Sequence, residues 1–125
     1  MSTAPEQASK PSGNWSRLLL NKVVIVTGAG GAIGSAIAYG CVLHGAHVIV
    51  ADINKKAADK VVRKIINEDE TKKECVMATE LDVSDEQAIQ NAIKAIVDKW
   101  NTVDVLVNTA AIFTFGSVEN ASAEA

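Results

Sequence analysis

The sequence predicts an α/β fold built on a doubly wound parallel sheet. Short apolar segments rich in β-branched residues alternate with longer segments in which apolar residues recur at helical spacing. A glycine-rich turn joins the first apolar segment, 23–27, to the first helical segment, as in a strand–turn–helix unit. With 125 residues, 48% hydrophobic and 22% charged, the chain has the size and composition of one globular domain.

Composition excludes several classes of function. The net charge of −3 gives no electrostatic footprint for nucleic acid or for an anionic membrane, and no stretch is long enough to cross a bilayer. Cys41 and Cys75 lack the spacing of a metal or redox site, so we expect buried free thiols and no metal. Residues 1–19 are expected to be a disordered N-terminal tail, and a cytoplasmic location is the default.

The elements follow in order from Val23. A strand over 23–27 precedes a helix over about 32–44, which Gly45 ends. The residues of this helix expected on its sheet-facing stripe are Ile33, Ala36, Ile37, Gly40 and Cys41. The next strand, 47–51, ends at Asp52. This first half predicts two parallel strands joined by a helical crossover.

The second half repeats the alternation. Apolar pairs predict helices over about 55–67 and 85–100, and strands over 75–81 and 103–108, the last of these buried. Ser84, with Gln87 three residues later, has the pattern of a capping box at the start of the third helix. Right-handed crossovers then give about four strands in the order 3-2-1-4 with three helices, a Rossmann-like but incomplete sheet.

The glycine turn has the chemistry of a phosphate site. Gly28, Gly30 and Gly31 break the chain after the first strand, and Gly34 lies in the first turn of the helix. The free N–H groups and dipole of the helix favour an anion there, and glycines let the backbone approach a phosphate closely. No Gly-Lys-Ser/Thr follows the turn, which argues against a P-loop.

An acidic residue near the turn predicts a dinucleotide. Asp52 lies 18 residues after Gly34, close to the spacing of about 20 expected for the carboxylate that binds a ribose. It would repel the 2′-phosphate of NADP, no Arg or Lys lies in 29–33 to compensate, and Ile53 follows the acid. We therefore expect NAD as the cofactor, with NADP less favoured.

Three motifs resemble the cofactor half of the short-chain dehydrogenase/reductase family. Thr27, Gly28 and Gly34 match its Thr-Gly-x-x-x-Gly-x-Gly turn, with Ala32 in place of the middle glycine. The segment Leu81-Asp82-Val83 resembles the segment after the family's third strand. The segment Asn108-Thr109-Ala110-Ala111 resembles its Asn-Asn-Ala-Gly signature and departs from it at Thr109 and Ala111.

The resemblance implies roles for these positions. Asp82 would hold the adenine amine and Val83 would pack on the ring, while Asn108 would lie near the cofactor and steady the sheet. The full set of candidate cofactor residues is Gly28, Gly30, Gly31, Ile33, Gly34, Asp52, Ile53, Asp82, Val83, Asn108 and Ala110. The complete parent would be a homo-oligomer that transfers hydride to or from a small-molecule alcohol or carbonyl.

No catalytic residue can be named. The family's chemistry uses a serine, and a tyrosine with a lysine four residues later, but the only tyrosine is Tyr39, inside the first helix, and Leu43 stands four residues on. Ser117 and Ser122 precede any fifth strand. We expect 20–125 to be an NAD(P)-binding Rossmann domain that stops before its second half, so whether the chain itself is an enzyme stays open.

Two alternatives to the oxidoreductase remain open. The first is a non-catalytic dinucleotide-binding fragment, which would share the cofactor site and lack turnover. The second is half of an S-adenosylmethionine-dependent methyltransferase, which also has a glycine turn and an acid after its second strand. That class usually has an acidic residue just before the glycines, where this chain has Thr27.

Overall fold

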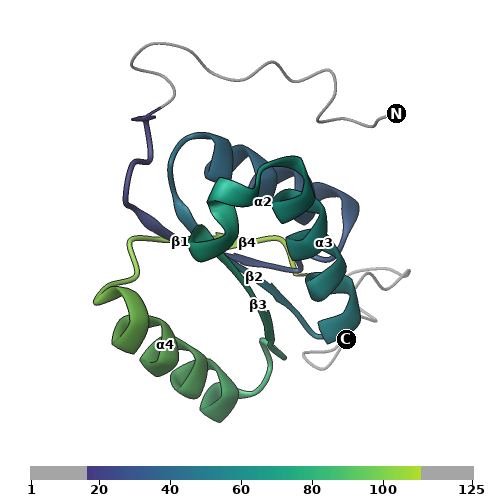
Figure 1. Cartoon of the computed structure of the whole chain (residues 1–125). Coiled ribbons are helices and arrows are strands. Elements are labelled where there is room, and N and C mark those ends of the chain that lie inside the picture. Colours follow the sequence, from purple (N-terminus) through teal and green to yellow (C-terminus); the bar gives the residue numbers. More distant parts are fainter. Residues whose placement is uncertain (1–16, 111–125) are drawn as a thin grey trace, which may run out of the picture.

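Four parallel strands form one sheet with the order β3-β2-β1-β4 in the computed structural model, which describes residues 17–110 (Figure 1). The elements in chain order are β1 (Val23–Thr27), α2 (Ala32–Leu43), β2 (His47–Asp52), α3 (Lys55–Glu68), the 3₁₀ helix η2 (Glu70–Cys75), β3 (Val76–Glu80), α4 (Glu86–Trp100) and β4 (Val105–Asn108). The predicted strand order and parallel pairing are confirmed. Predictions that concern 1–16 and 111–125, including Ser117 and Ser122, lie outside the described residues.

The helices cover both faces of the sheet. Figure 1 shows α2 and α3 on one face and α4 on the other. Val24, Val26 and their neighbours on β2 pack with α2 and α3, whereas Val23, Ile25 and Ile49 pack toward Ile96 of α4. Because both of their faces are covered, β1 and β2 are continuous apolar runs instead of alternating ones.

The sheet-facing side of α2 differs from the predicted stripe. Its buried residues are Gly34, Ala38 and Val42, while Ile33 is 73% exposed and Ala36 is also exposed. A Cβ built on Gly34 would lie 2.5 Å from the Gly28 carbonyl oxygen, so the helix approaches the turn too closely for a larger residue. The prediction was right for Ile37 and Cys41, which are partly buried and pack against the core, and wrong for Ile33 and Ala36. The register differs because the closest approach of the helix is made at its small buried residues, Gly34 and Ala38.

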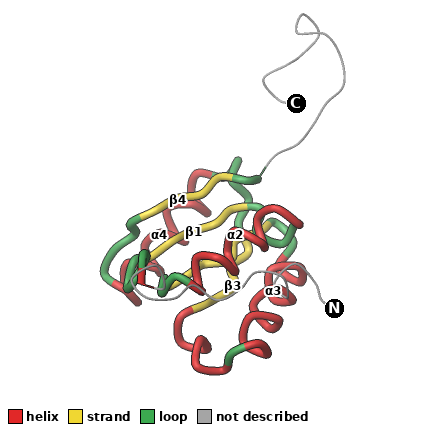
Figure 2. The backbone as a smooth tube through the Cα atoms, turned by 90° about the horizontal axis from the view of Figure 1, so that it is seen from above, coloured by secondary structure: helices red, strands yellow, loops and turns green. Residues whose placement is uncertain are grey.

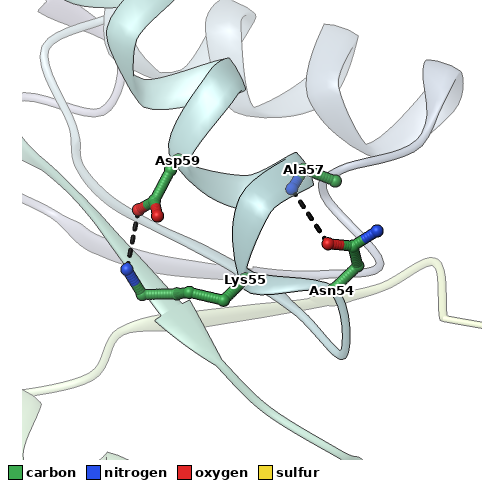
Figure 3. A network of polar contacts seen from close by, with 4 residues as sticks. All are labelled: Asn54, Lys55, Ala57 and Asp59. Carbon is green, nitrogen blue, oxygen red and sulfur yellow. Dashed lines mark hydrogen bonds and ion pairs between the residues drawn. The ribbon is translucent and has the colours of Figure 1, made fainter.

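The second crossover contains an element that the sequence did not predict. η2 follows α3 and ends at Cys75, so β3 begins one residue later than expected, at Val76. At the start of α3, the Asn54 side chain accepts a hydrogen bond from the Ala57 N–H, and Lys55 pairs with Asp59 at 2.7 Å (Figure 3). These contacts fix the beginning of α3 directly after β2.

The cap of α4 is Asp85, not Ser84. The Asp85 carboxylate accepts a hydrogen bond from the Ala88 N–H at 3.1 Å. Ser84 instead donates its hydroxyl to Asp82, and the Gln87 side chain donates to Asn91, so the predicted capping box does not form. The helix therefore begins one residue later than expected, at Glu86.

The last strand is shorter and less buried than predicted. β4 begins at Val105, and its Leu106 is 59% exposed. Figure 2 shows β4 at one edge of the sheet beside β1, so among the described strands it has a neighbour on one side only. Before β4, the Asp104 carboxylate accepts from the Val23 N–H at 2.8 Å and ties this edge to the start of β1.

Two further expectations concern cysteines and membranes. Cys41 and Cys75 are both free and partly buried, and burial raises the pKa of the Cys41 thiol. Among residues 17–110, none of the helices combines the length and the apolar character needed to span a bilayer.

Candidate functional site

The carboxyl ends of the strands meet at one edge of the sheet. Thr27 at the end of β1 pairs with Ala51 on one side and with Asn108 on the other, and Asp52 pairs with Glu80. β1 and β4 lie next to each other although they are far apart in sequence, which makes the gap beyond their ends the switch point of the sheet. Ligands of open α/β sheets bind at such a point, so this edge is the candidate site.

Gly28 turns the chain at this edge. Its φ is +65°, a conformation that residues with a side chain rarely adopt. A Cβ there would lie 2.8 Å from the Ala110 nitrogen, so the turn also packs directly against the segment after β4. Gly31 has room by comparison, since its nearest neighbour would be 3.5 Å away.

The N-terminus of α2 offers free donors. Gly31 caps the helix without a side-chain hydrogen bond, and the first turn contains no acidic residue. Ser35 donates to the Gly31 carbonyl in the first helical hydrogen bond, so the N–H groups of 32–34 precede the helix's own bonding. Three donors at the positive end of a helix dipole make an anion site suited to a pyrophosphate.

Asp52 reaches back to the glycine turn. Its Oδ2 accepts a hydrogen bond from the Gly30 N–H at 2.8 Å, and its Oδ1 accepts from the Asn54 N–H at 2.9 Å. Each carboxylate oxygen has a second lone pair, so both can still accept from a ligand hydroxyl. Asp52 thus holds the turn in shape and lies beside it. Ile53, the next residue, is 66% exposed.

A polar network joins β1 to the segment after β4. The Thr27 hydroxyl donates to Asn108 Oδ1 at 3.1 Å and accepts from the Ala110 N–H at 3.4 Å. The Thr109 hydroxyl donates to the Thr27 carbonyl oxygen. Asn108 is therefore engaged in holding the sheet together at the site, and Thr27 and Thr109 are central members that the set of site residues inferred from the sequence did not include.

Asp82 lies apart from the glycine turn. It is fully exposed, and its Oδ1 accepts from the Ser84 hydroxyl at 2.6 Å and from the Ser84 N–H at 2.9 Å. These two hydrogen bonds, that of the hydroxyl first, hold the pKa of Asp82 below its ordinary value. Val83 beside it is 44% exposed. Both side chains face solvent at the end of β3, where they can meet a ligand without moving core groups.

A cavity of about 520 Å³ lies between the sheet and α4. It brings three predicted site residues together, Val83, Asn108 and Ala110. The rest of its lining is mostly apolar and includes Ile25, Ile49, Leu81, Ile96 and Leu106. Gly30 lines a different groove of about 530 Å³, which runs between α2 and α3. Within 17–110, no cluster of three or more metal-ligating side chains occurs.

The comparisons with known proteins decide the family. A family model described as short chain dehydrogenase matches residues 22–125. The chain belongs to the short-chain dehydrogenase family. This membership confirms the resemblance inferred from the three motifs, and it gives no support to the methyltransferase alternative.

Individual proteins are similar over most of this chain. Meso-2,3-butanediol dehydrogenase from Serratia marcescens is 39% identical over 98 residues, covering 78% of this chain and 37% of the relative. The C-domain of bacterial malonyl-CoA reductase with NADP has a TM-score of 0.73 at 25% identity, covering 79% of this chain and 16% of that one.

A Haemophilus influenza structure described as a D-mannonate oxidoreductase with bound NAD has a TM-score of 0.63 at 31% identity, covering 70% of this chain and 30% of that one. This chain spans well under half the length of each of these three proteins.

Proposed function

We propose that this chain is the dinucleotide-binding part of an NAD-dependent oxidoreductase that transfers hydride to or from a small-molecule alcohol or carbonyl compound. One observation carries the proposal. The Asp52 carboxylate lies 2.8 Å from the Gly30 nitrogen, so an acceptor for ribose hydroxyls stands beside the turn that presents the donors of α2. An anion site and a ribose acceptor this close together suit the pyrophosphate and the ribose of an adenosine diphosphate.

The described residues divide the work of holding the cofactor. In this proposal the N–H groups of 32–34 bind the pyrophosphate, and Asp52 accepts from the adenosine ribose. Ile53 and Val83, both exposed, flank the adenine, and Asp82 accepts from its amine. The bound nicotinamide would supply or accept the hydride, and the chain's part is to orient it at the end of β4.

The preference for NAD rests on charge. Relatives with NAD and with NADP are both similar to this chain, so family membership supports a nicotinamide dinucleotide of either kind. A 2′-phosphate about 4 Å from Asp52 would cost on the order of 4 kcal/mol at an effective dielectric of about 20, and less where water enters. Residues 29–33 contain no Arg or Lys to offset this repulsion.

Titration of the full-length protein with NADH and with NADPH tests the preference. We expect NADH to bind more tightly than NADPH. In Asp52→Asn, the dissociation constant for NADPH divided by that for NADH should fall at least tenfold. The ratio is the right readout because Asn also loosens the bond to Gly30, which affects both nucleotides equally. Asp59→Asn, which removes an exposed carboxylate on α3, is the matched control and should leave the ratio unchanged. Equal or tighter NADPH binding by the unmodified protein would contradict the assignment.

The proton donor for the reaction is assigned to a segment outside 17–110. Tyr39, the chain's single tyrosine, lies on α2 with its pKa raised, first by burial and then by the charges of Glu68 and Asp69. It lines the groove between α2 and α3, whereas hydride transfer would occur at the end of β4. A cytoplasmic homo-oligomer completes the proposal, to be checked by cell fractionation and by light scattering of the full-length protein.

A further inference from the structure

Thr109 contacts both ends of the glycine turn. Its hydroxyl donates a hydrogen bond to the carbonyl oxygen of Thr27, the residue that enters the turn. A Cβ built on Gly34, the residue that leaves the turn, would lie 2.8 Å from the same Thr109 oxygen. The Thr109 hydroxyl therefore lies against the first and last parts of the turn. Thr109 is partly buried and follows Thr27 by 82 positions in the sequence.

The backbone around Thr109 reinforces this contact. A Cβ on Gly28 would lie 2.8 Å from the Ala110 nitrogen and 3.0 Å from the Thr109 carbonyl carbon. The Ala110 N–H also donates to the Thr27 hydroxyl at 3.4 Å. The segment after β4 thus lies directly against the turn. It leaves no room for a side chain at residue 28, and at residue 34 it adds to the closer contacts with the Gly28 carbonyl oxygen and the Ala29 Cα.

The position of the segment after β4 affects where the free donors of α2 point. Gly34 is the last of the three residues whose N–H groups precede the helix's own bonding, and Thr27 fixes the end of β1. We propose that the Thr109 hydroxyl is a positioning group for the pyrophosphate site, which holds the first turn of α2 at a fixed distance from the end of β1. This inference rests on the proposed dinucleotide function.

Two substitutions separate positioning from simple packing. Thr109→Val keeps the shape and removes the hydroxyl, and Thr109→Ser keeps the hydroxyl and removes a methyl group. In the full-length protein we expect Thr109→Val to weaken NADH binding between about two- and tenfold, the loss of one hydrogen bond, and Thr109→Ser to bind nearly as the unmodified protein does. Thr102→Val, at an exposed threonine near the other end of β4, is the matched control and should change nothing.

Hydrogen exchange supplies a local readout. The Gly31 and Ser35 N–H groups are bonded to the carbonyls of Gly28 and Gly31. They should exchange faster in Thr109→Val and not in Thr109→Ser, while amides in β2 stay unchanged. Unaltered NADH affinity in Thr109→Val, or equal weakening in both variants, would overturn this inference alone. An unmodified protein that binds no NADH would overturn the proposed function and this inference with it.

Discussion

Three glycines near the α2 N-terminus, Gly28, Gly31 and Gly34, have different physical roles. Gly28 needs its positive φ and its closeness to Ala110, and Gly34 lies against the Gly28 carbonyl and Thr109. Gly31 has an ordinary extended conformation, and a Cβ there would make only an ordinary contact, 3.5 Å from the Gly28 carbonyl oxygen. The requirement for glycine at 28 and 34 is therefore a packing requirement of the fold before it is a requirement of phosphate binding.

Alanine substitutions should separate these roles. Gly28→Ala and Gly34→Ala are each expected to lower the free energy of unfolding by about 2–4 kcal/mol, because a methyl group must displace backbone atoms. Gly31→Ala should stay within about 0.5 kcal/mol of the unmodified protein. Urea denaturation of the full-length protein measures all three. A Gly34→Ala variant as stable as Gly31→Ala would show that the turn can shift enough to admit a methyl group at residue 34.

The hydrogen bond between Ser84 and Asp82 predicts a change in the pKa of Asp82 when the serine hydroxyl is removed. Ser84→Ala removes the hydroxyl bond, the larger cause of the lowered pKa, so the pKa of Asp82 should rise toward its ordinary value of 3.8. Because the folded-state pKa is depressed, the interaction is present above that ordinary value and is lost as pH falls through the lowered pKa. An NMR titration of the Asp82 carboxyl measures the change. Ser35→Ala, whose hydroxyl bonds to Ala32 instead, should leave it unaffected.

At the scale of elements, the cap of α4 can be tested directly. Asp85→Ala removes the side chain that accepts from the Ala88 N–H and should cost about 0.5–2 kcal/mol of stability. Ser84→Ala, one residue earlier, should cost about 0.5 kcal/mol or less, since Ser84 does not cap the helix. Thermal unfolding of the two variants side by side makes the comparison. Equal losses would mean that the cap is shared between the two residues.

The sequence predicted some helix and strand boundaries well and others poorly. The runs that form β1 and β2 were predicted to within one residue, because only strands covered on both faces are continuously apolar. The cap of α4 was misplaced because Asp82, Ser84 and Asp85 are all good capping residues, and only the backbone geometry selects one.

At the site, the sequence could predict what a local motif encodes and little more. The glycine turn and the position of Asp52 follow from a strand–turn–helix unit and a spacing, and the structure has Asp52 bonded to that turn. The part played by Thr109 depends on a contact between residues 82 positions apart. No periodicity or spacing reports such a contact, and the departure of Thr109 from the family motif was the one available signal.

At the scale of the molecule, the described part leaves apolar surface uncovered on one side. Leu106 on β4 and Ile93 and Val97 on α4 are exposed. Leu106 and Ile93 also line the cavity between the sheet and α4, whose lining is mainly aliphatic. Among the strands of 17–110, β4 has a neighbour on one side only, which leaves backbone groups on its other side next to this surface. Apolar faces beside an open strand edge are templates for association with another chain or another segment.

The 125-residue chain purified by itself should therefore self-associate, bind NADH weakly, and catalyse no hydride transfer. Association follows from the exposed β4 edge, and Leu106→Lys should reduce it, because a charge at the edge opposes pairing. We expect weak binding because the donors of α2 and Asp52 are both present. We expect no turnover because the family's chemistry uses a tyrosine, and the only tyrosine, Tyr39, lies on α2, whereas hydride transfer would occur at the end of β4. Light scattering measures the association state, and NADH oxidation with a panel of ketones and aldehydes measures turnover. A monomer that turns over any of these compounds would contradict both the exposed-edge argument and the assignment of the proton donor to another segment.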